Sequence, residues 1–374
     1  MLMKLSLNKN DLSKLQTLID TKYLNMEADD LFSSYLQEDY LSVTRQDVMD
    51  LVNTQSMSKK EAFLTSLLLN RDISPEDEEI QKMKEEGYFE KVDRLNAMPY
   101  KKNPYGASLD IQEKEEAEWS LSYNYYAPYE GFLYDDVYSD PNHYFMERNS
   151  IGFFEEKVPY LCLIEKSVLW MSITPFEINT MKTAIDNAHG KVITYGLGLG
   201  YFSFMAINNP NVESVTVIEK DPKAIKMFES EILPKIRLRD KLTIIKGDAV
   251  CYTKKRFSED HYDYAFFDIY HSAADGIESY LRMKKIEDRN PECEFVYWIE
   301  NSLLALLRRF IITLFEENLQ GFTDKDYQVQ ESPEDRLINA IYQAIGDREF
   351  KSYDEIHSFL LDSSLKEFAK KISI

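Results

Sequence analysis

The sequence is poor in cysteine, histidine, glycine and positive charge. Its 374 residues include 3 cysteines, 5 histidines and 12 glycines, and 44 lysines and arginines stand against 65 aspartates and glutamates. The cysteines form no CxxC pair, which excludes a disulfide framework and indicates a reducing, cytoplasmic location. The histidines are scattered, and the sequence has no Cys/His cluster of the zinc-binding kind. We therefore predict neither disulfides nor a metal site.

Long apolar runs are also lacking. The most apolar stretch with a helical pattern, "SLLALLRRFIITLF", is too short to cross a bilayer and carries Arg308 and Arg309 at its middle. The N-terminal residues lack the sustained apolar core of a signal peptide. We therefore expect no membrane association.

The excess of acids gives a formal net charge of −21 at pH 7. Nucleic-acid binding depends on lysine and arginine contacts to phosphate, so this balance disfavours an RNA or DNA partner. A neutral or cationic small molecule, or a protein, is easier to accommodate.

Sequence patterns divide the chain into four regions. Residues 1–104 have the capping and periodicity of helices, as in "SMSKKEAFLTSLLLN" and "SPEDEEIQKMKEEG". Residues 105–173 are rich in aromatic and β-branched residues, which predicts a small β-rich region whose many tyrosines either pack a sheet or line a pocket. Residues 174–321 alternate strands with helices, and residues 322–374 form a helical tail.

The third region predicts an α/β fold. Short apolar strands ("KVITYG", "SVTVIE", "KLTIIKGD", "YDYAFFD" and "EFVYWIE") are separated by helical segments. This pattern is typical of a parallel sheet covered on both faces, and right-handed crossovers make it a doubly wound, Rossmann-like sheet. The region opens with Thr174, Pro175 and Glu177, which read as a capping box at a helix start.

Glycine, scarce elsewhere, gathers in the segment "KVITYGLGLGYFS". Gly196, Gly198 and Gly200 lie within five positions, directly after the first strand. In a doubly wound sheet, ligands bind at the carboxyl ends of the strands. The spacing is G-x-G-x-G, and Tyr201 occupies the position where a dinucleotide fingerprint needs its last glycine. A pyrophosphate ligand is therefore not favoured.

Acidic residues follow the next three strands. Glu219 ends the second strand, where a carboxylate can accept both hydroxyls of a ribose. Asp248, followed by Ala249 in "KGDA", ends the third strand, where an acid can accept from an adenine amine. Asp268 ends the fourth. Three such carboxylates behind a glycine loop predict a nucleoside site, whereas Asp221 is explained as a helix cap.

The loop after the fourth strand supplies the candidate reactive residues. Asp268, Tyr270 and His271 should border the same crevice. His271 has the ordinary pKa of a general base at neutral pH, although it can equally be a loop residue bonded to backbone. Such a base is needed only where the group that reacts carries a proton.

With these motifs, residues 175–320 resemble the class I S-adenosylmethionine-dependent methyltransferases. The resemblance implies that Gly196, Gly198 and Gly200 let the backbone approach S-adenosylmethionine. It also implies that Glu219 holds the ribose and that Asp248 and Ala249 hold the adenine. Many members carry an acid two residues before the first glycine, where this sequence has Thr194.

The closest branch in pattern is the spermidine-synthase-like one, which also has a small β-rich region before the sheet. Two of its diagnostic acids are replaced here, by Leu199 in the loop and by His271 after the fourth strand. We therefore expect methyl transfer to a small neutral or cationic acceptor, or a protein. Aminopropyl transfer, an NAD-dependent oxidoreductase and a non-catalytic nucleoside-binding module stay open as alternatives.

Leu199 also sets an expectation about the donor. An aminopropyl donor ends in an ammonium that needs a carboxylate beside the loop, and leucine offers none. We therefore expect S-adenosylmethionine to bind at least about tenfold more tightly than its decarboxylated form. The sequence specifies neither the acceptor nor the oligomeric state.

Overall fold

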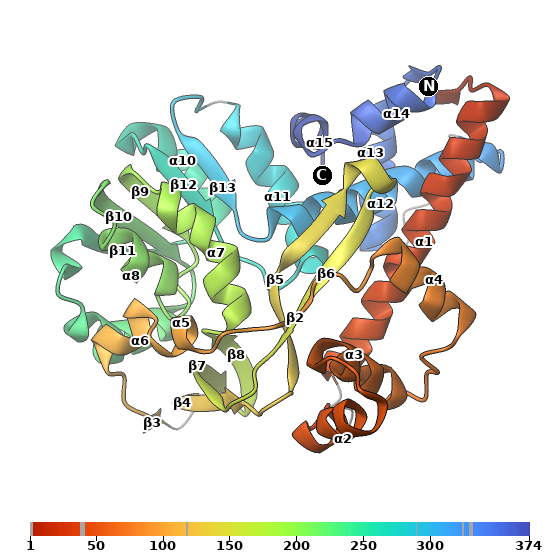
Figure 1. Ribbon diagram of the computed structural model, residues 1–374. Helices are drawn as coiled ribbons and strands as arrows, with labels where there is room; N and C mark the ends of the chain where they lie inside the picture. The colour runs from red at the N-terminus through yellow and green to blue at the C-terminus, as the bar shows by residue number, and fades with distance from the viewer. Residues whose placement is uncertain (1–2, 38–41, 117–118, 289, 324, 329–331) are drawn as a thin grey trace.

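A five-stranded parallel sheet forms one side of the structure, on the left in Figure 1. The computed structural model describes residues 3–37, 42–116, 119–288, 290–323, 325–328 and 332–374. The strands are β9 (Gly190–Tyr195), β10 (Val212–Glu219), β11 (Leu242–Lys246), β12 (Tyr264–Phe267) and β13 (Glu294–Tyr297). Their order across the sheet is β11-β10-β9-β12-β13, and every neighbouring pair is parallel. The predicted doubly wound α/β fold is confirmed.

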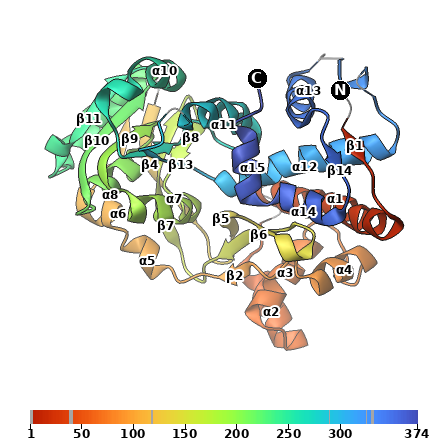
Figure 2. The ribbon, with the colours of Figure 1, turned by 90° about the horizontal axis from the view of Figure 1, so that it is seen from above.

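Helices cover both faces of this sheet (Figure 2). One face carries α7 (Pro175–Asn187), α8 (Tyr201–Ile207) and α9 (Pro222–Met227), and the other carries α10 (Ala249–Asp260), α11 (Ala273–Glu287) and α12 (Glu300–Leu319). The chain moves outward from β9 to β11 and then returns to β12 on the other side of β9. The carboxyl ends of β9 and β12 therefore flank the point where strand order reverses, which is where such sheets bind ligands.

The central strands are buried on both sides, which explains their unbroken apolar sequence. Tyr264, Ala265, Phe266 and Phe267 expose 0–1% of their surface. Tyr195 of β9 stacks on Phe267 with ring centroids 4.4 Å apart. Aromatic packing of this kind makes the middle of the sheet rigid, so the loops at its carboxyl edge start from fixed points.

Two smaller sheets precede the parallel one. A four-stranded antiparallel sheet has the order β3-β4-β7-β8 and a three-stranded sheet the order β2-β6-β5. The strands are β2 (Val92–Arg94), β3 (Lys114–Glu115), β4 (Trp119–Tyr126), β5 (Gly131–Asp140), β6 (Met146–Phe153), β7 (Val158–Glu165) and β8 (Val168–Ser172). β5 packs against both α7 and α12, which joins the small sheets to the parallel one.

The remaining helices come from the two ends of the chain. They are α1 (Lys9–Gln37), α2 (Arg45–Gln55), α3 (Lys59–Leu69), α4 (Glu78–Glu86), α5 (Met98–Lys101), α6 (Pro104–Leu109), α13 (Pro333–Ile345), α14 (Tyr353–Leu360) and α15 (Asp362–Ala369). As the sequence predicts, Ser58 and Glu61 form a capping box at the start of α3, and Gly87 ends α4 in a left-handed conformation.

The ends of the chain meet in the fold. The short strand β1 (Lys4–Leu5) pairs in parallel with β14 (Glu349–Phe350), and α1 packs on α12, β6 and α14 (Figure 1). In the described part of the chain, no helix combines the length and apolar character that crossing a membrane requires.

Candidate functional site

The glycine loop joins β9 to α8 at the reversal point of the sheet. All three of its glycines have positive φ, +94° at Gly196, +56° at Gly198 and +74° at Gly200. A Cβ on Gly196 would lie 1.9 Å from the carbonyl oxygen of Asp268, and one on Gly200 would lie 2.1 Å from the ring of Phe228. These two glycines therefore allow close packing within the chain itself.

Gly198 differs from its two neighbours. The nearest atom to a Cβ on it would be the Sδ of Met171 at 3.2 Å, the end of a flexible side chain on β8. Gly198 is therefore the loop glycine that leaves room for a ligand to approach the backbone. Its contact with S-adenosylmethionine stays a prediction.

The segment between β2 and β3 contacts the glycine loop and the start of α8. The hydroxyl of Tyr105 donates to the carbonyl oxygen of Leu199, and Asn103 Nδ2 donates to the hydroxyl of Tyr201 over 3.0 Å. Leu199 itself exposes 3% of its surface and belongs to the main core. Leu199 therefore presents little open surface to a ligand. The expected preference for S-adenosylmethionine depends on the lack of a carboxylate at this position, and it stays a prediction.

Glu219 ties the glycine loop to the end of β10. Its Oε2 accepts from the backbone N–H of Leu197 over 2.9 Å, and its Oε1 accepts from the N–H of Asp221 over 2.7 Å. The side chain exposes 8% of its surface. Each carboxylate oxygen can accept a second hydrogen bond. The predicted contact to a ribose therefore fits beside these two bonds.

Asp248 caps α10. Its Oδ1 accepts from the backbone N–H of Cys251 over 2.8 Å, and the residue is exposed at the carboxyl end of β11. Ala249 follows it at the first helical position and is buried. Asp221 caps α9, as the sequence predicts, by accepting from the N–H of Lys223 over 2.8 Å.

Asp268 and Glu177 form a pair of half-buried acids, called the acid pair below. Asp268 follows β12, and Glu177 lies in the first turn of α7. Burial, together with the charge of Glu219, raises the pKa of Asp268 to about 7. Burial, together with the charge of Asp268, raises the pKa of Glu177 well above its ordinary value. Both side chains thus face a common, poorly solvated space.

The acid pair has no internal counter-charge. Across the residues that the structure describes, neither carboxylate forms an ion pair or a hydrogen bond. Two facing carboxylates that lack a donor disfavour their own ionised forms. A cation placed between them would relieve that cost.

Glu177 is a site residue that sequence reasoning missed. The capping box was expected to engage its side chain, and Thr174 does accept from the N–H of Glu177 over 3.4 Å. The Glu177 carboxylate, however, lies near Asp268. A signal was present in the sequence, because this acid begins the helix that leads directly into the glycine-loop strand.

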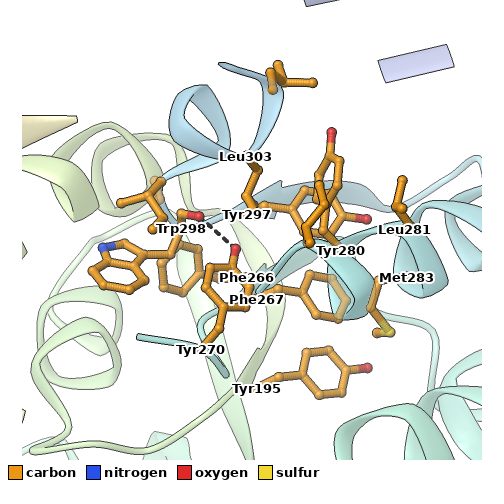
Figure 3. Close-up of a cluster of buried hydrophobic side chains, with 14 of the residues drawn as sticks. Tyr195, Phe266, Phe267, Tyr270, Tyr280, Leu281, Met283, Tyr297, Trp298 and Leu303 are labelled. Atoms are coloured by element: carbon orange, nitrogen blue, oxygen red, sulfur yellow. Dashed lines mark hydrogen bonds between the residues drawn. The ribbon is translucent and has the colours of Figure 1, made fainter. Parts of the chain in front are cut away.

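The hydroxyl of Tyr270 is hydrogen-bonded to the backbone directly after β13. Its hydroxyl donates to the carbonyl oxygen of Trp298 over 2.6 Å, as the dashed line in Figure 3 shows, and its ring stacks on the Trp298 indole. A Cβ on Gly276 of α11 would lie 2.6 Å from the Tyr270 ring. Tyr270, predicted as a candidate catalytic residue, therefore joins β13 and α11 to the end of β12 in this structure.

His271 is exposed at the start of α11. Its backbone N–H donates to Asp275 Oδ2 over 3.0 Å. The structure therefore places Asp268 alone, of the three candidate reactive residues, in the space shared with Glu177.

Asp136 of β5 extends the acidic character of this edge. Its Oδ2 accepts from the backbone N–H of Asn301 over 3.0 Å, and its Oδ1 accepts from the hydroxyl of Ser302, both at the start of α12. Burial raises the pKa of Asp136 to about 6. Burial raises the pKa of Tyr270, and the charges of Asp268 and Asp136 raise it further, so both acids lie near Tyr270.

In the described ranges of the chain, no three acidic, histidine or cysteine side chains are arranged to hold a metal ion.

Comparison with known proteins adds little to this geometry. The sequence matches no family model and no curated protein. Among solved structures, it is similar to precorrin 8W decarboxylase of Methanobacterium thermoautotrophicum, with a TM-score of 0.26 and 19% sequence identity. The match covers 33% of this chain and 63% of that one, less than two thirds of its length. A likeness at this level carries no inference about activity, and the chain is shown only to contain a Rossmann-like α/β sheet.

Proposed function

We propose that this protein transfers a group, a methyl group first of all, from S-adenosylmethionine to a small cationic or neutral acceptor. The observation that carries the proposal is the acid pair, which faces the reversal point of the sheet without a counter-charge in the described residues. An uncompensated carboxylate pair in a poorly solvated space favours a cationic ligand.

A sulfonium donor satisfies the site in two ways. Its nucleoside part has candidate partners in Glu219 for the ribose and in Asp248 for the adenine. Its positive sulfur and ammonium match the acids at the end of β12 and the start of α7. Asp268 would hold the charged part of the donor or of an amine acceptor, and its raised pKa suits it to receive a proton from such an amine near neutral pH.

Aminopropyl transfer is a second candidate because of Glu177. A decarboxylated donor needs an acid beside the glycine loop, and Leu199 does not supply one. Glu177 lies beside Asp268 and supplies such an acid from α7. The sequence-based expectation of a tenfold preference for S-adenosylmethionine is therefore a test between the two reactions.

Calorimetric titration of the full chain with S-adenosylmethionine, decarboxylated S-adenosylmethionine and NAD tests the proposal. We expect S-adenosylmethionine to bind and NAD to fail, because Tyr201 replaces the last glycine of the dinucleotide fingerprint and the acid pair would repel a pyrophosphate. If decarboxylated S-adenosylmethionine binds more tightly than S-adenosylmethionine, the proposed reaction becomes aminopropyl transfer instead of methyl transfer. NAD binding without S-adenosylmethionine binding would contradict both reactions. Mass spectrometry of the products formed with a set of small amines then identifies the transferred group.

A further inference from the structure

A groove of about 450 Å³ lies between α11, α13 and the C-terminal residues. Its volume is within the range of small-molecule sites, roughly 300–1,000 Å³. None of its lining residues belongs to the glycine loop or the acid pair. It is a separate feature, and an inference about it is independent of the proposed function.

Positive charge gathers around this groove in a chain whose net charge is −21. Arg282 of α11, Arg336 of α13 and Lys371 line it. Arg282 pairs with Glu278 on its own helix at 2.9 Å. Arg336 and Lys371, by contrast, form no ion pair with any residue that the structure describes. Arg336 belongs to α13 and Lys371 to the C-terminal segment, so an anion between them would meet two cations that have no ion pair among the described residues.

Three apolar residues of α13, called the floor below, line the groove beside Asn339 and Gln343 of the same helix. Leu337, Ala340 and Ala344 line it from α13, and their spacing of three and four places them on one face of that helix. Leu337 exposes 6% of its surface, whereas the two alanines are half-buried. The small alanine side chains leave the space that a flat or extended apolar group would fill.

The C-terminal wall is held in place by α11. Lys285 Nζ donates to the hydroxyl of Ser373 over 2.8 Å, and Ser373 lines the groove. Ile372, between Lys371 and Ser373, is completely buried. Lys371 is therefore carried by an anchored segment, which reduces the entropy lost when a ligand is bound.

We propose that this groove binds a small amphipathic anion, with its negative group between Arg336 and Lys371 and its apolar part on the alanine face of α13. The two cations would bind the anionic group of the ligand, and the floor would contact its apolar part. Inorganic phosphate lacks that body and should bind poorly.

The probe for this site is 8-anilino-1-naphthalenesulfonate, an aromatic sulfonate whose fluorescence rises on binding, titrated into the full chain. We expect one saturable phase that weakens at least tenfold in Arg336→Glu/Lys371→Glu, the loss that follows from removing charged contacts. Ala340→Trp should weaken it too by filling the floor. Arg239→Glu, at an exposed arginine near the opposite edge of the sheet, serves as the matched charge control and should bind like wild type.

Competition identifies the ligand class. Decanoate should displace the probe, whereas inorganic phosphate at the same concentration should not. The proposal is overturned if wild type shows no saturable phase, if the double variant binds as tightly as wild type, or if Arg239→Glu loses as much affinity. Equal displacement by phosphate would also overturn it. Circular dichroism of each variant verifies that the fold is retained.

Discussion

Two regions of this molecule bury charge, and they treat it in opposite ways. Beneath α12, Arg309 donates to Glu147, which exposes 2% of its surface, and to Asp29. Arg308, which exposes 1%, donates to Asp362, to Ser139 and to a backbone carbonyl. This arginine cluster (Arg308, Arg309, Glu147, Asp29 and Asp362) is fully partnered. The acid pair at the carboxyl edge of the parallel sheet has no such partner among the described residues.

The presence or absence of partners for the buried charge distinguishes a structural role from a ligand-binding role. Burying a charge costs several kcal/mol unless a partner compensates it. In the arginine cluster the chain supplies the partners itself, and these link α1, β6 and α15 to α12. At the acid pair the chain leaves the cost in place, in the location where a doubly wound sheet binds its ligand. We therefore interpret the cluster as a structural joint and the acid pair as a ligand site.

The largest expected effect is in the arginine cluster. Arg309→Met leaves the buried Glu147 without its cation, which should lower the free energy of unfolding by about 3–5 kcal/mol, as for other broken buried pairs. Urea denaturation measures this loss. Arg309→Met/Glu147→Gln removes both charges and should recover much of it. A single variant as stable as wild type would mean that the cluster is not a structural joint.

The next effect compares two glycines of the same loop. Gly196→Ala places a methyl group against the Asp268 carbonyl at φ +94°, and strain with overpacking should cost about 2–4 kcal/mol of stability. Gly198→Ala meets only the flexible Met171 at φ +56° and should cost about 1 kcal/mol. Thermal unfolding of both variants measures the two losses of stability. Equal losses would show that the two positions do not differ as their neighbours suggest.

A smaller effect is the pH dependence of the acid pair. Asp268 has a pKa of about 7 in the fold against 3.8 for the free side chain, so the native state binds the extra proton between these values. Stability should therefore fall as pH rises from about 4 to about 7, because the unfolded state binds fewer protons there. In Asp268→Asn, the part of this pH-dependent decrease in stability that comes from Asp268 should be absent. Parallel pH-dependent curves for the two proteins would contradict the raised pKa.

Much of the fold could be predicted because its determinants are local. Unbroken apolar runs such as residues 264–267 indicate strands buried on both faces, and capping boxes such as Ser58 with Glu61 indicate helix starts. Chain order then places Glu219 and Asp268 at one edge of the sheet, since parallel strands all end there. The location of the site follows from these rules.

The directions of side chains could not be predicted in the same way. Glu177 has a local explanation as a cap, and only the packing of α7 beside β12 turns it towards Asp268. Tyr270 reads as a loop residue near the crevice, but the carbonyl oxygen that it binds belongs to Trp298, 28 residues later. Gly196 lies against the backbone of Asp268 and Gly200 against the ring of Phe228. The loop sequence alone does not reveal these contacts.

The central claim is that the acid pair holds the positive charge of the donor, and calorimetry with Asp268→Asn tests it most directly. S-adenosylmethionine carries a sulfonium, whereas S-adenosylhomocysteine has a neutral thioether and otherwise the same groups. We expect Asp268→Asn to weaken S-adenosylmethionine by about 10- to 100-fold, the scale of a lost charge-assisted contact, and to change S-adenosylhomocysteine far less. Equal changes for the two ligands, or none for either, would contradict the account.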